Sequence, residues 1–257
     1  GANMANRDLI YIGVSGDGDT ASIGLGQFCH AVRRRLNMTY VVMNNGCYGL
    51  TKGQFSATND KASPSKKGEA NPFEGIDLCQ MAIQLGAGFV ARSFSGDKKQ
   101  LVPLLKAAIS YNGFAFLDVV SPCVTFNNHP TSTRSYDYVR AHNMASENKL
   151  DYIEPKEEIT VDYATGTSAT ITMHDGSRLI LDKLDETHDP RDSNAALHLI
   201  RTSAAKGAVA TGLLYINEEQ TDLHDILGTD SRPLNTLPMS ELCPGSKALD
   251  GINARLR

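Results

Sequence analysis

The pattern of apolar and polar positions predicts alternating strands and helices in the first half of the chain. Residues 9–14 form a continuous apolar run, which is typical of a strand buried on both faces. Residues 20–36 predict a helix, because Phe28, Val32 and Leu36 recur at every fourth position and give it one apolar face. Residues 39–43 form a second apolar run. Because a strand, a helix and a strand follow one another, we expect two parallel strands joined by a right-handed crossover.

The same alternation continues beyond the second strand. Helices are predicted for residues 76–85 and 98–110, and strands for residues 89–91 and 116–120. Before them, residues 46–71 are rich in Gly, Ser, Thr and Lys and form a connection longer than most ordered loops. Long loops on a rigid scaffold commonly carry function, so this segment is a candidate for a binding loop.

Beyond Pro130 the pattern changes. Residues 158–181 alternate β-branched and polar residues around two glycine turns and predict an antiparallel hairpin or meander. A helix at 193–206 and a strand at 212–216 follow. We therefore expect an α/β fold with a mostly parallel sheet, helices on both faces and a small C-terminal hairpin and helix. The expected units are residues 1–130 as the main domain and residues 131–257 as a C-terminal extension.

Composition and charge exclude several classes of protein. The chain has 257 residues and a net charge of −4 with basic residues spread along it, so the short run Arg33-Arg34-Arg35 predicts a solvated helix face rather than a nucleic-acid surface. No apolar stretch approaches the roughly 20 residues of a membrane span. The start of the chain lacks the pattern of a secretory signal, so a cytoplasmic location is expected. The five scattered cysteines contain no C-x-x-C pair and argue against a disulfide framework.

A glycine turn follows the first predicted strand, and an asparagine pair follows the second. The turn is Gly16-Asp17-Gly18, the pair is Asn44-Asn45, and 25 residues from Asp19 to Met43 separate them. The turn does not match the dinucleotide-binding fingerprint G-x-G-x-x-G, because Ala21 replaces the third glycine, and the sequence contains no P-loop. Since neighbouring parallel strands end at the same edge of a sheet, the two motifs are expected to meet there.

The donor types at this edge favour magnesium together with a diphosphate. Magnesium prefers oxygen ligands and usually shares them with substrate phosphates. The Asp17 carboxylate, the Asn45 side-chain carbonyl and a backbone carbonyl near Cys47 provide such oxygens. Gly16 and Gly18 would let the diphosphate approach the backbone closely. The alternative is that both motifs are ordinary tight turns.

The two motifs together match the thiamine-diphosphate motif, and the sequence around them resembles one family. The resemblance is to the beta subunit of 2-oxoacid:ferredoxin oxidoreductases, particularly the 2-oxoglutarate branch, and it covers residues 1 to about 130 densely. Its most specific stretch is residues 44–54, NNGCYGLTKGQ. Further matches are residues 30–34 (HAVRR), 71–73 (NPF), 89–92 (FVAR), 94–97 (FSGD), 121–127 (SPCVTFN) and, less specifically, 242–246 (LCPGS).

The resemblance implies a reaction and roles for residues. Such enzymes decarboxylate a 2-oxoacid on thiamine diphosphate, pass electrons through a 4Fe–4S cluster to ferredoxin, and transfer the acyl group to coenzyme A. Lys52 is expected to pair with the distal carboxylate of 2-oxoglutarate, unless it is only a solvated loop lysine. The remaining expected roles are the substrate pocket for Thr51 and Gln54, magnesium for Asp17, Asn45 and the Cys47 carbonyl, and cofactor contacts for Gly16, Gly18, Asp19, Tyr48, Gly49 and Leu50.

Cys123 matches the last cluster ligand of this family, whose other three cysteines lie upstream of the glycine turn. A 4Fe–4S cluster normally takes four thiolates, and only 15 residues without cysteine precede Gly16. Because the chain starts without Met in what looks like the end of a helix, we expect an N-terminal truncation. The alternative is that the cluster is absent and Cys123 is a buried thiol.

The family implies a partner alpha subunit, which supplies the carboxylate that activates the thiamine ring, and a hetero-oligomer with two copies of each subunit. Two other functions remain open from the residues. One is a non-redox thiamine-diphosphate decarboxylase or carboligase, which would share the cofactor motif without a cluster. The other is a non-catalytic assembly partner, against which the intact glycine turn and asparagine pair argue.

Overall fold

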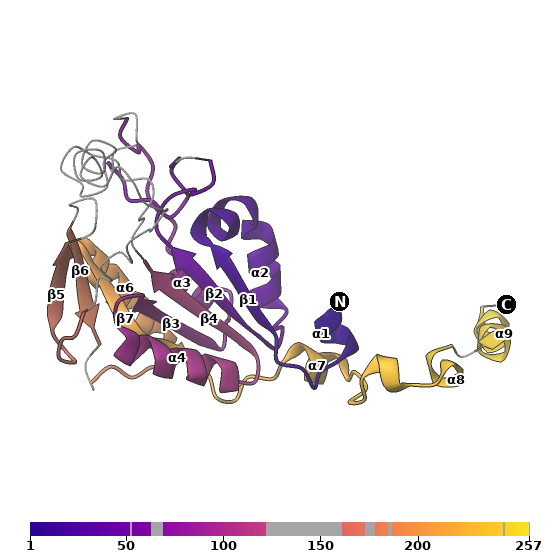
Figure 1. Ribbon diagram of the computed structural model, residues 1–257. Helices are drawn as coiled ribbons and strands as arrows, with labels where there is room; N and C mark the ends of the chain where they lie inside the picture. The colour runs from indigo at the N-terminus through magenta and orange to yellow at the C-terminus, as the bar shows by residue number, and fades with distance from the viewer. Residues whose placement is uncertain are drawn as a thin grey trace, which may run out of the picture.

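In the computed structural model, the described residues are 1–51, 53–62, 69–121, 161–172, 178–184, 187–243 and 245–256. They form a seven-stranded sheet in the order β1-β2-β4-β3-β7-β6-β5 (Figure 1). β1, β2, β4 and β3 run parallel to one another, β7 is antiparallel to β3 but parallel to β6, and β5 is antiparallel to β6. The strands are β1 (Ile12–Gly16), β2 (Met38–Asn44), β3 (Phe89–Phe94), β4 (Phe114–Val120), β5 (Ser168–Thr172), β6 (Arg178–Lys183) and β7 (Ala208–Ile216).

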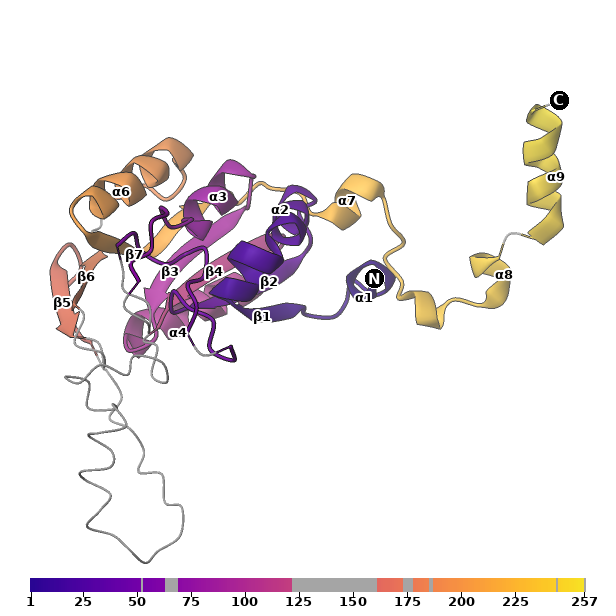
Figure 2. The same cartoon turned by 90° about the horizontal axis from the view of Figure 1, so that it is seen from above.

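Helices cover both faces of the sheet, as the sequence predicts (Figures 1 and 2). α2 (Leu25–Arg33), α3 (Leu78–Gln84) and α6 (Ser193–Ala205) lie on one face, and α4 (Lys98–Ser110) lies on the other. This arrangement encloses a separate apolar core on each side of the central strands.

β4 shows how the sequence builds the two cores. Adjacent residues of a strand point to opposite faces. Phe114 and Phe116 therefore pack under α2, α3 and α6, whereas Ala115 and Leu117 pack under α4, and all four side chains are fully buried. A continuous apolar run is needed here because both faces of β4 are covered.

The predicted helix over residues 20–36 is interrupted. A π-helical segment, Gly18–Ile23, precedes α2, and Gly24 separates the two. The N–H of Gly24 donates to the carbonyl of Asp19 over 2.7 Å, and a side chain at Gly24 would lie 2.8 Å from that oxygen. The π-helical segment thus turns tightly directly after the glycine motif, and only α2 continues as a regular helix.

The prediction that the first strand is buried on both faces is wrong for the described chain. β1 is an edge strand, and the side chains of Ile12 and Val14 are 50% and 67% exposed. α2 lies on the other face of the sheet, and α4 lies over β3 and β4 and leaves Ile12 and Val14 open. The apolar run therefore reflects a surface that no described residue covers.

The C-terminal half continues the same sheet. β5 and β6 form the predicted antiparallel hairpin, and β7 joins it to β3. The boundary expected at residue 130 lies outside the described residues. The chain then runs through α7 (Leu223–Leu227), the 3-10 turn Leu234–Thr236, α8 (Met239–Leu242) and α9 (Gly245–Arg255), and the last two lead away from the sheet (Figures 1 and 2).

None of the described helices combines the length and the apolarity needed to cross a membrane. The cytoplasmic location expected from the sequence stays a prediction.

Candidate active site

Asp17 lies at the carboxyl end of β1, directly before the π-helical segment, and its side chain is buried. Three donors surround its carboxylate. Oδ1 accepts from the backbone N–H of Asn45 over 3.2 Å. Oδ2 accepts from the hydroxyl of Ser56 and lies 2.7 Å from the hydroxyl of Thr58. A buried carboxylate with this many donors is held in one orientation, and this orientation leaves lone-pair capacity on Oδ1.

Asn45 reaches Asp17 because β1 and β2 are parallel and in register. Gly16 pairs with Met43, so the residues that follow the two strands lie side by side. The side-chain oxygen of Asn45 accepts from the backbone N–H of Cys47 over 3.1 Å. The thiol of Cys47 donates to the same oxygen over 3.5 Å, so a bound cation would replace this long contact. The structure thus brings Asp17, Asn45 and Cys47 together, as the strand order requires.

The loop after β2 folds back on itself. Cys47 and Phe55 form an antiparallel bridge, and the N–H of Tyr48 donates to the carbonyl of Gln54 over 2.9 Å. Gly46, at a φ of 75°, makes the turn that starts this small hairpin. Its carbonyl accepts from the N–H of Ser56 over 3.2 Å, which places Ser56 against Asp17.

Tyr48 closes over the glycine turn. Its hydroxyl donates to the carbonyl of Gly18 over 3.1 Å. A β-carbon added to Gly18 would lie 2.6 Å from the Tyr48 ring, which is closer than real atoms approach. Gly18 therefore needs to be glycine because an aromatic ring packs on its backbone.

The other predicted site residues lie around this centre with exposed side chains. Asp19, Gly49, Leu50, Thr51 and Gln54 are all exposed, and Leu50 is 98% exposed. The hydroxyl of Thr51 donates to the side-chain carbonyl of Gln54 over 2.5 Å, so these two residues meet at the end of the small hairpin. Lys52 and Cys123 lie outside the described residues, and their roles stay predictions.

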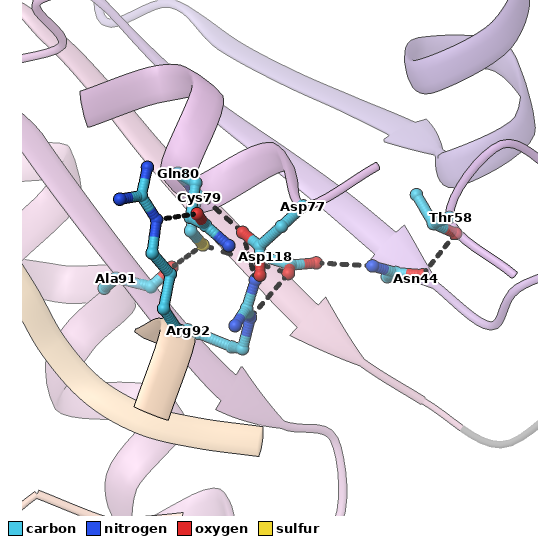
Figure 3. Close-up of polar contacts among 9 residues, drawn as sticks. Asn44, Thr58, Asp77, Cys79, Gln80, Ala91, Arg92 and Asp118 are labelled. Atoms are coloured by element: carbon cyan, nitrogen blue, oxygen red, sulfur yellow. Dashed lines mark hydrogen bonds and ion pairs between the residues drawn. The ribbon is translucent and has the colours of Figure 1, made fainter. Parts of the chain in front are cut away.

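A second set of charged residues lies in β3, in β4 and at the start of α3 (Figure 3). Arg92 of β3 donates from Nε to Asp118 of β4 over 2.7 Å and from a terminal nitrogen to Asp77 over 2.8 Å. The other oxygen of Asp118 accepts from Nδ2 of Asn44 over 3.1 Å, and Oδ1 of Asn44 lies 3.0 Å from the hydroxyl of Thr58. A continuous path of polar contacts therefore joins Arg92 to the residues that hold Asp17.

Burial and the shared guanidinium change the pKa values of the two carboxylates in different directions. Burial raises the pKa of Asp118 above its usual value, although Arg92 acts in the opposite direction. Burial alone would also raise the pKa of Asp77, but the charge of Arg92 and the hydrogen bond from the Gln80 N–H outweigh it and lower the pKa. Asp77 therefore stays ionised to a lower pH than Asp118 does.

Sequence reasoning missed Ser56, Thr58, Asp77, Arg92 and Asp118. Two of them carried a signal, because Arg92 and Asp118 each occupy an apolar strand, where a charged residue is rarely buried unless it is paired. Ser56 and Thr58 carried none. Their positions depend on how the loop folds back, which is a long-range contact that local sequence does not encode.

The donor set fits a magnesium ion that is shared with a diphosphate. Among the described residues, no three His, Cys, Asp or Glu side chains converge on one point. At this edge of the sheet the described chain presents the buried carboxylate of Asp17 together with amide and backbone oxygens. Such a set would leave coordination positions for phosphate oxygens. Asp17, Asn45 and Cys47 could hold such an ion, and the closely packed glycine turn could border the diphosphate.

Comparison with known proteins agrees with this chemistry. Residues 1–119 match the family of thiamine pyrophosphate enzymes, C-terminal TPP binding domain. The chain is 38% identical over 160 residues to the 2-oxoacid:ferredoxin oxidoreductase subunit beta of Saccharolobus solfataricus, covering 62% of this chain and 52% of that protein. It is 41% identical over 130 residues to the 2-oxoglutarate synthase subunit KorB of Methanocaldococcus jannaschii, covering 49% of this chain and 47% of that protein.

The chain is similar to 2-oxoacid:ferredoxin oxidoreductase beta subunits over about half of its length. Its fold also matches a solved structure, that of 2-oxoglutarate:ferredoxin oxidoreductase from Magnetococcus marinus with 2-oxoglutarate, coenzyme A and succinyl-CoA bound. The TM-score is 0.62 at 29% identity, and the match covers 89% of this chain and 67% of that chain. The predicted α/β fold and the predicted family resemblance are both confirmed. The chain spans about half the length of the curated relatives it matches.

Proposed function

We propose that the chain is the thiamine-diphosphate-binding beta subunit of a 2-oxoacid:ferredoxin oxidoreductase that acts on 2-oxoglutarate. The reaction would convert 2-oxoglutarate and coenzyme A to succinyl-CoA and CO2, with two electrons passed to ferredoxin. The observation that carries the proposal is the convergence of Asp17 and Asn45 at the ends of two parallel strands. The names of its relatives support the reaction class.

The chain's own residues would mainly hold and orient the cofactor. When bound, thiamine diphosphate supplies the chemistry of decarboxylation. Oδ1 of Asp17, the side-chain oxygen of Asn45 and the carbonyl of Cys47 would bind magnesium. Gly16, Gly18 and Asp19 would border the diphosphate, and Tyr48, Gly49 and Leu50 would contact the cofactor from the small hairpin.

Substrate recognition would involve the end of the same hairpin. Lys52 would pair with the distal carboxylate of 2-oxoglutarate, and Thr51 and Gln54 would line the pocket beside it. Cys123 follows the carboxyl end of β4, the strand next to β2, and would be one ligand of a 4Fe–4S cluster.

The proposal also includes partners. An alpha subunit would complete the active site, in a complex with two copies of each subunit, and ferredoxin would accept the electrons. The chain is therefore expected to be inactive alone.

Anaerobic co-expression with the alpha subunit tests the proposal. We expect the purified complex to contain iron and sulfide and to reduce ferredoxin only when 2-oxoglutarate, coenzyme A and thiamine diphosphate are all present. Active complex without iron would reject the redox function and favour a thiamine-dependent decarboxylase. A complex that contains thiamine diphosphate but has no activity with any 2-oxoacid would favour a non-catalytic assembly role.

A further inference from the structure

The position of the Asp17 carboxylate depends on a hydroxyl that has more acceptors than protons. The Thr58 hydroxyl lies 2.7 Å from Oδ2 of Asp17, 3.0 Å from Oδ1 of Asn44 and 3.0 Å from the hydroxyl of Ser56. A hydroxyl donates one hydrogen bond. Which acceptor receives it depends on which atom of the Asn44 amide faces Thr58.

Asp118 determines the orientation of the Asn44 amide. Asn44 donates from Nδ2 to Oδ1 of Asp118, which turns the amide oxygen of Asn44 toward Thr58. If the amide rotated by half a turn, its NH2 group would donate to the Thr58 oxygen. The Thr58 proton would then go to Asp17 alone and draw negative charge from that carboxylate. Asp118 prevents this rotation because its carboxylate accepts hydrogen bonds from Asn44 and from Arg92.

Arg92 and the surrounding strands fix Asp118 in turn. Asp118 and Arg92 occupy paired positions on the neighbouring strands β4 and β3, and their side chains are 1% and 7% exposed. A charge pair buried this deeply in a sheet has little freedom to rearrange. The rigid pair is therefore connected through one amide to the residues around Asp17 (Figure 3).

We propose that Asp118, held by Arg92, is a positioning residue for the cation site: it keeps the oxygen of the Asn44 amide on Thr58, so that Asn44 shares the Thr58 proton and the Asp17 carboxylate keeps its negative charge for the cation. The inference rests on the proposed function, because it assigns the magnesium ion to Asp17. It adds three residues, Asn44, Thr58 and Asp118, to the side chains that set the affinity for the metal.

The geometry also provides a matched control. Asp77 forms the other ion pair of Arg92, at 2.8 Å compared with 2.7 Å for Asp118. Asp77 has its own structural role, because its side chain caps α3 by accepting from the N–H of Gln80. Asp77 has no hydrogen bond to Asn44 among the contacts of the described residues. Asp118→Asn and Asp77→Asn thus each remove one charge from the same guanidinium, but only Asp118→Asn alters the contact with Asn44.

The test is a titration of Mn2+, which binds the same kinds of oxygen ligand as magnesium, in the presence of thiamine diphosphate. Bound Mn2+ is followed by electron paramagnetic resonance in the complex with the alpha subunit. We expect Asp118→Asn to raise the dissociation constant of Mn2+ by about 10–100-fold, the usual effect of losing an outer partner of a metal ligand. Asp77→Asn is expected to leave the dissociation constant unchanged, although both variants lower the unfolding temperature of the metal-free complex.

A second variant keeps the inference testable if Asp118→Asn does not fold. Asn44→Ala leaves the pair of Asp118 and Arg92 in place and removes only the connecting amide. We expect it to raise the Mn2+ dissociation constant in the same direction.

The possible results separate the two claims. If the wild-type complex binds thiamine diphosphate and Mn2+ but Asp118→Asn or Asn44→Ala binds Mn2+ as tightly as wild type, the positioning role is rejected and the proposed function stands. The same conclusion follows if Asp77→Asn and Asp118→Asn weaken binding equally. If the wild-type complex binds no Mn2+, the proposed cofactor site itself is rejected, and the inference is rejected with it.

Discussion

At the scale of single residues, the site depends on how the oxygens of Asp17 are used. Asn45 and Ser56 donate to the buried carboxylate, and Thr58 shares one proton between Asp17 and Asn44. Oδ1 has only the N–H of Asn45 as a donor among the described contacts, so it keeps capacity for a further partner. The carboxylate is thus tied to the loop after β2, and the proposed cation would bind at Oδ1.

Lys52 carries the residue-scale prediction for substrate choice. If its ammonium group pairs with the distal carboxylate of 2-oxoglutarate, Lys52→Ala removes a charge-assisted bond of about 1.5–3 kcal/mol, which is about a 10–100-fold loss of kcat/KM. Pyruvate lacks that carboxylate, so its turnover should change little. The control is Lys61→Ala in the same loop, where Lys61 forms an exposed ion pair with Glu74. Equal losses for 2-oxoglutarate and pyruvate would show that Lys52 has no role in specificity.

The residue types of the candidate site could be predicted from sequence, but not all of its members. Asp17 and Asn45 each follow an apolar run, and the parallel strand order brings them together. Thr58 is one polar residue of a long polar loop, and its contact with Asp17 spans 41 positions of sequence. Asp118 was visible as a charged residue in a buried strand, but its partners depend on which strands are neighbours.

At the scale of elements, the glycine turn and the small hairpin after β2 act as one unit. The Tyr48 ring packs on Gly18, and its hydroxyl donates to the carbonyl of the same residue. The start of the π-helical segment and the hairpin are therefore fixed relative to each other before any ligand binds.

Gly18→Ala tests this contact. The new methyl group would overlap the Tyr48 ring, and overpacking of this kind destabilises by about 1–3 kcal/mol. We expect a lower free energy of unfolding and weaker binding of thiamine diphosphate, measured by chemical denaturation and calorimetry. Gly26→Ala in α2 is the control, since nothing lies within 4 Å of its β-carbon position. It should stabilise the chain by up to about 1 kcal/mol, because alanine favours a helix. Unchanged stability and binding in Gly18→Ala would contradict the close packing of Tyr48.

The type of an element was predictable where the apolar residues recur with a clear period. It was least predictable at the edge of the sheet and at the start of α2. α4 begins and ends where the pattern of residues 98–110 predicts. The exposure of Ile12 and Val14 was not predictable, because an apolar run does not reveal whether a helix covers the strand. The break at Gly24 was not predicted, because apolar residues occur on both sides of it and suggest one continuous helix.

At the scale of the whole molecule, the C-terminal half extends the sheet that carries the site. β7 pairs with β3, the strand of Arg92, so the hairpin of β5 and β6 adds to the sheet at the edge away from β1. Tyr111, just after α4, ties the two halves together, because its hydroxyl donates to the carbonyl of Asn217 over 2.6 Å.

This connection predicts a loss of stability at alkaline pH. Burial raises the pKa of Tyr111 from 10.0 to about 12. The folded chain then keeps the phenol proton at a pH where the unfolded chain has lost it. The stabilisation is therefore complete below pH 10 and is lost as the pH rises to about 12. We expect the free energy of unfolding of wild type to fall toward that of Tyr111→Phe over this range, as measured by denaturation at each pH. A constant difference between the two proteins would contradict the raised pKa.

The most direct test of the account is magnesium-dependent binding of thiamine diphosphate, measured by calorimetry on the complex with the alpha subunit. The account predicts that wild type binds the cofactor only when magnesium is present. Asp17→Asn should weaken binding by about 100-fold or more, since Asp17 would contact the metal directly and loss of an outer partner alone costs about 10–100-fold. Asp8→Asn, the same change at an exposed position, should bind like wild type. The account would be contradicted if wild type bound thiamine diphosphate without magnesium, or if the Asp17→Asn variant bound it as tightly as wild type.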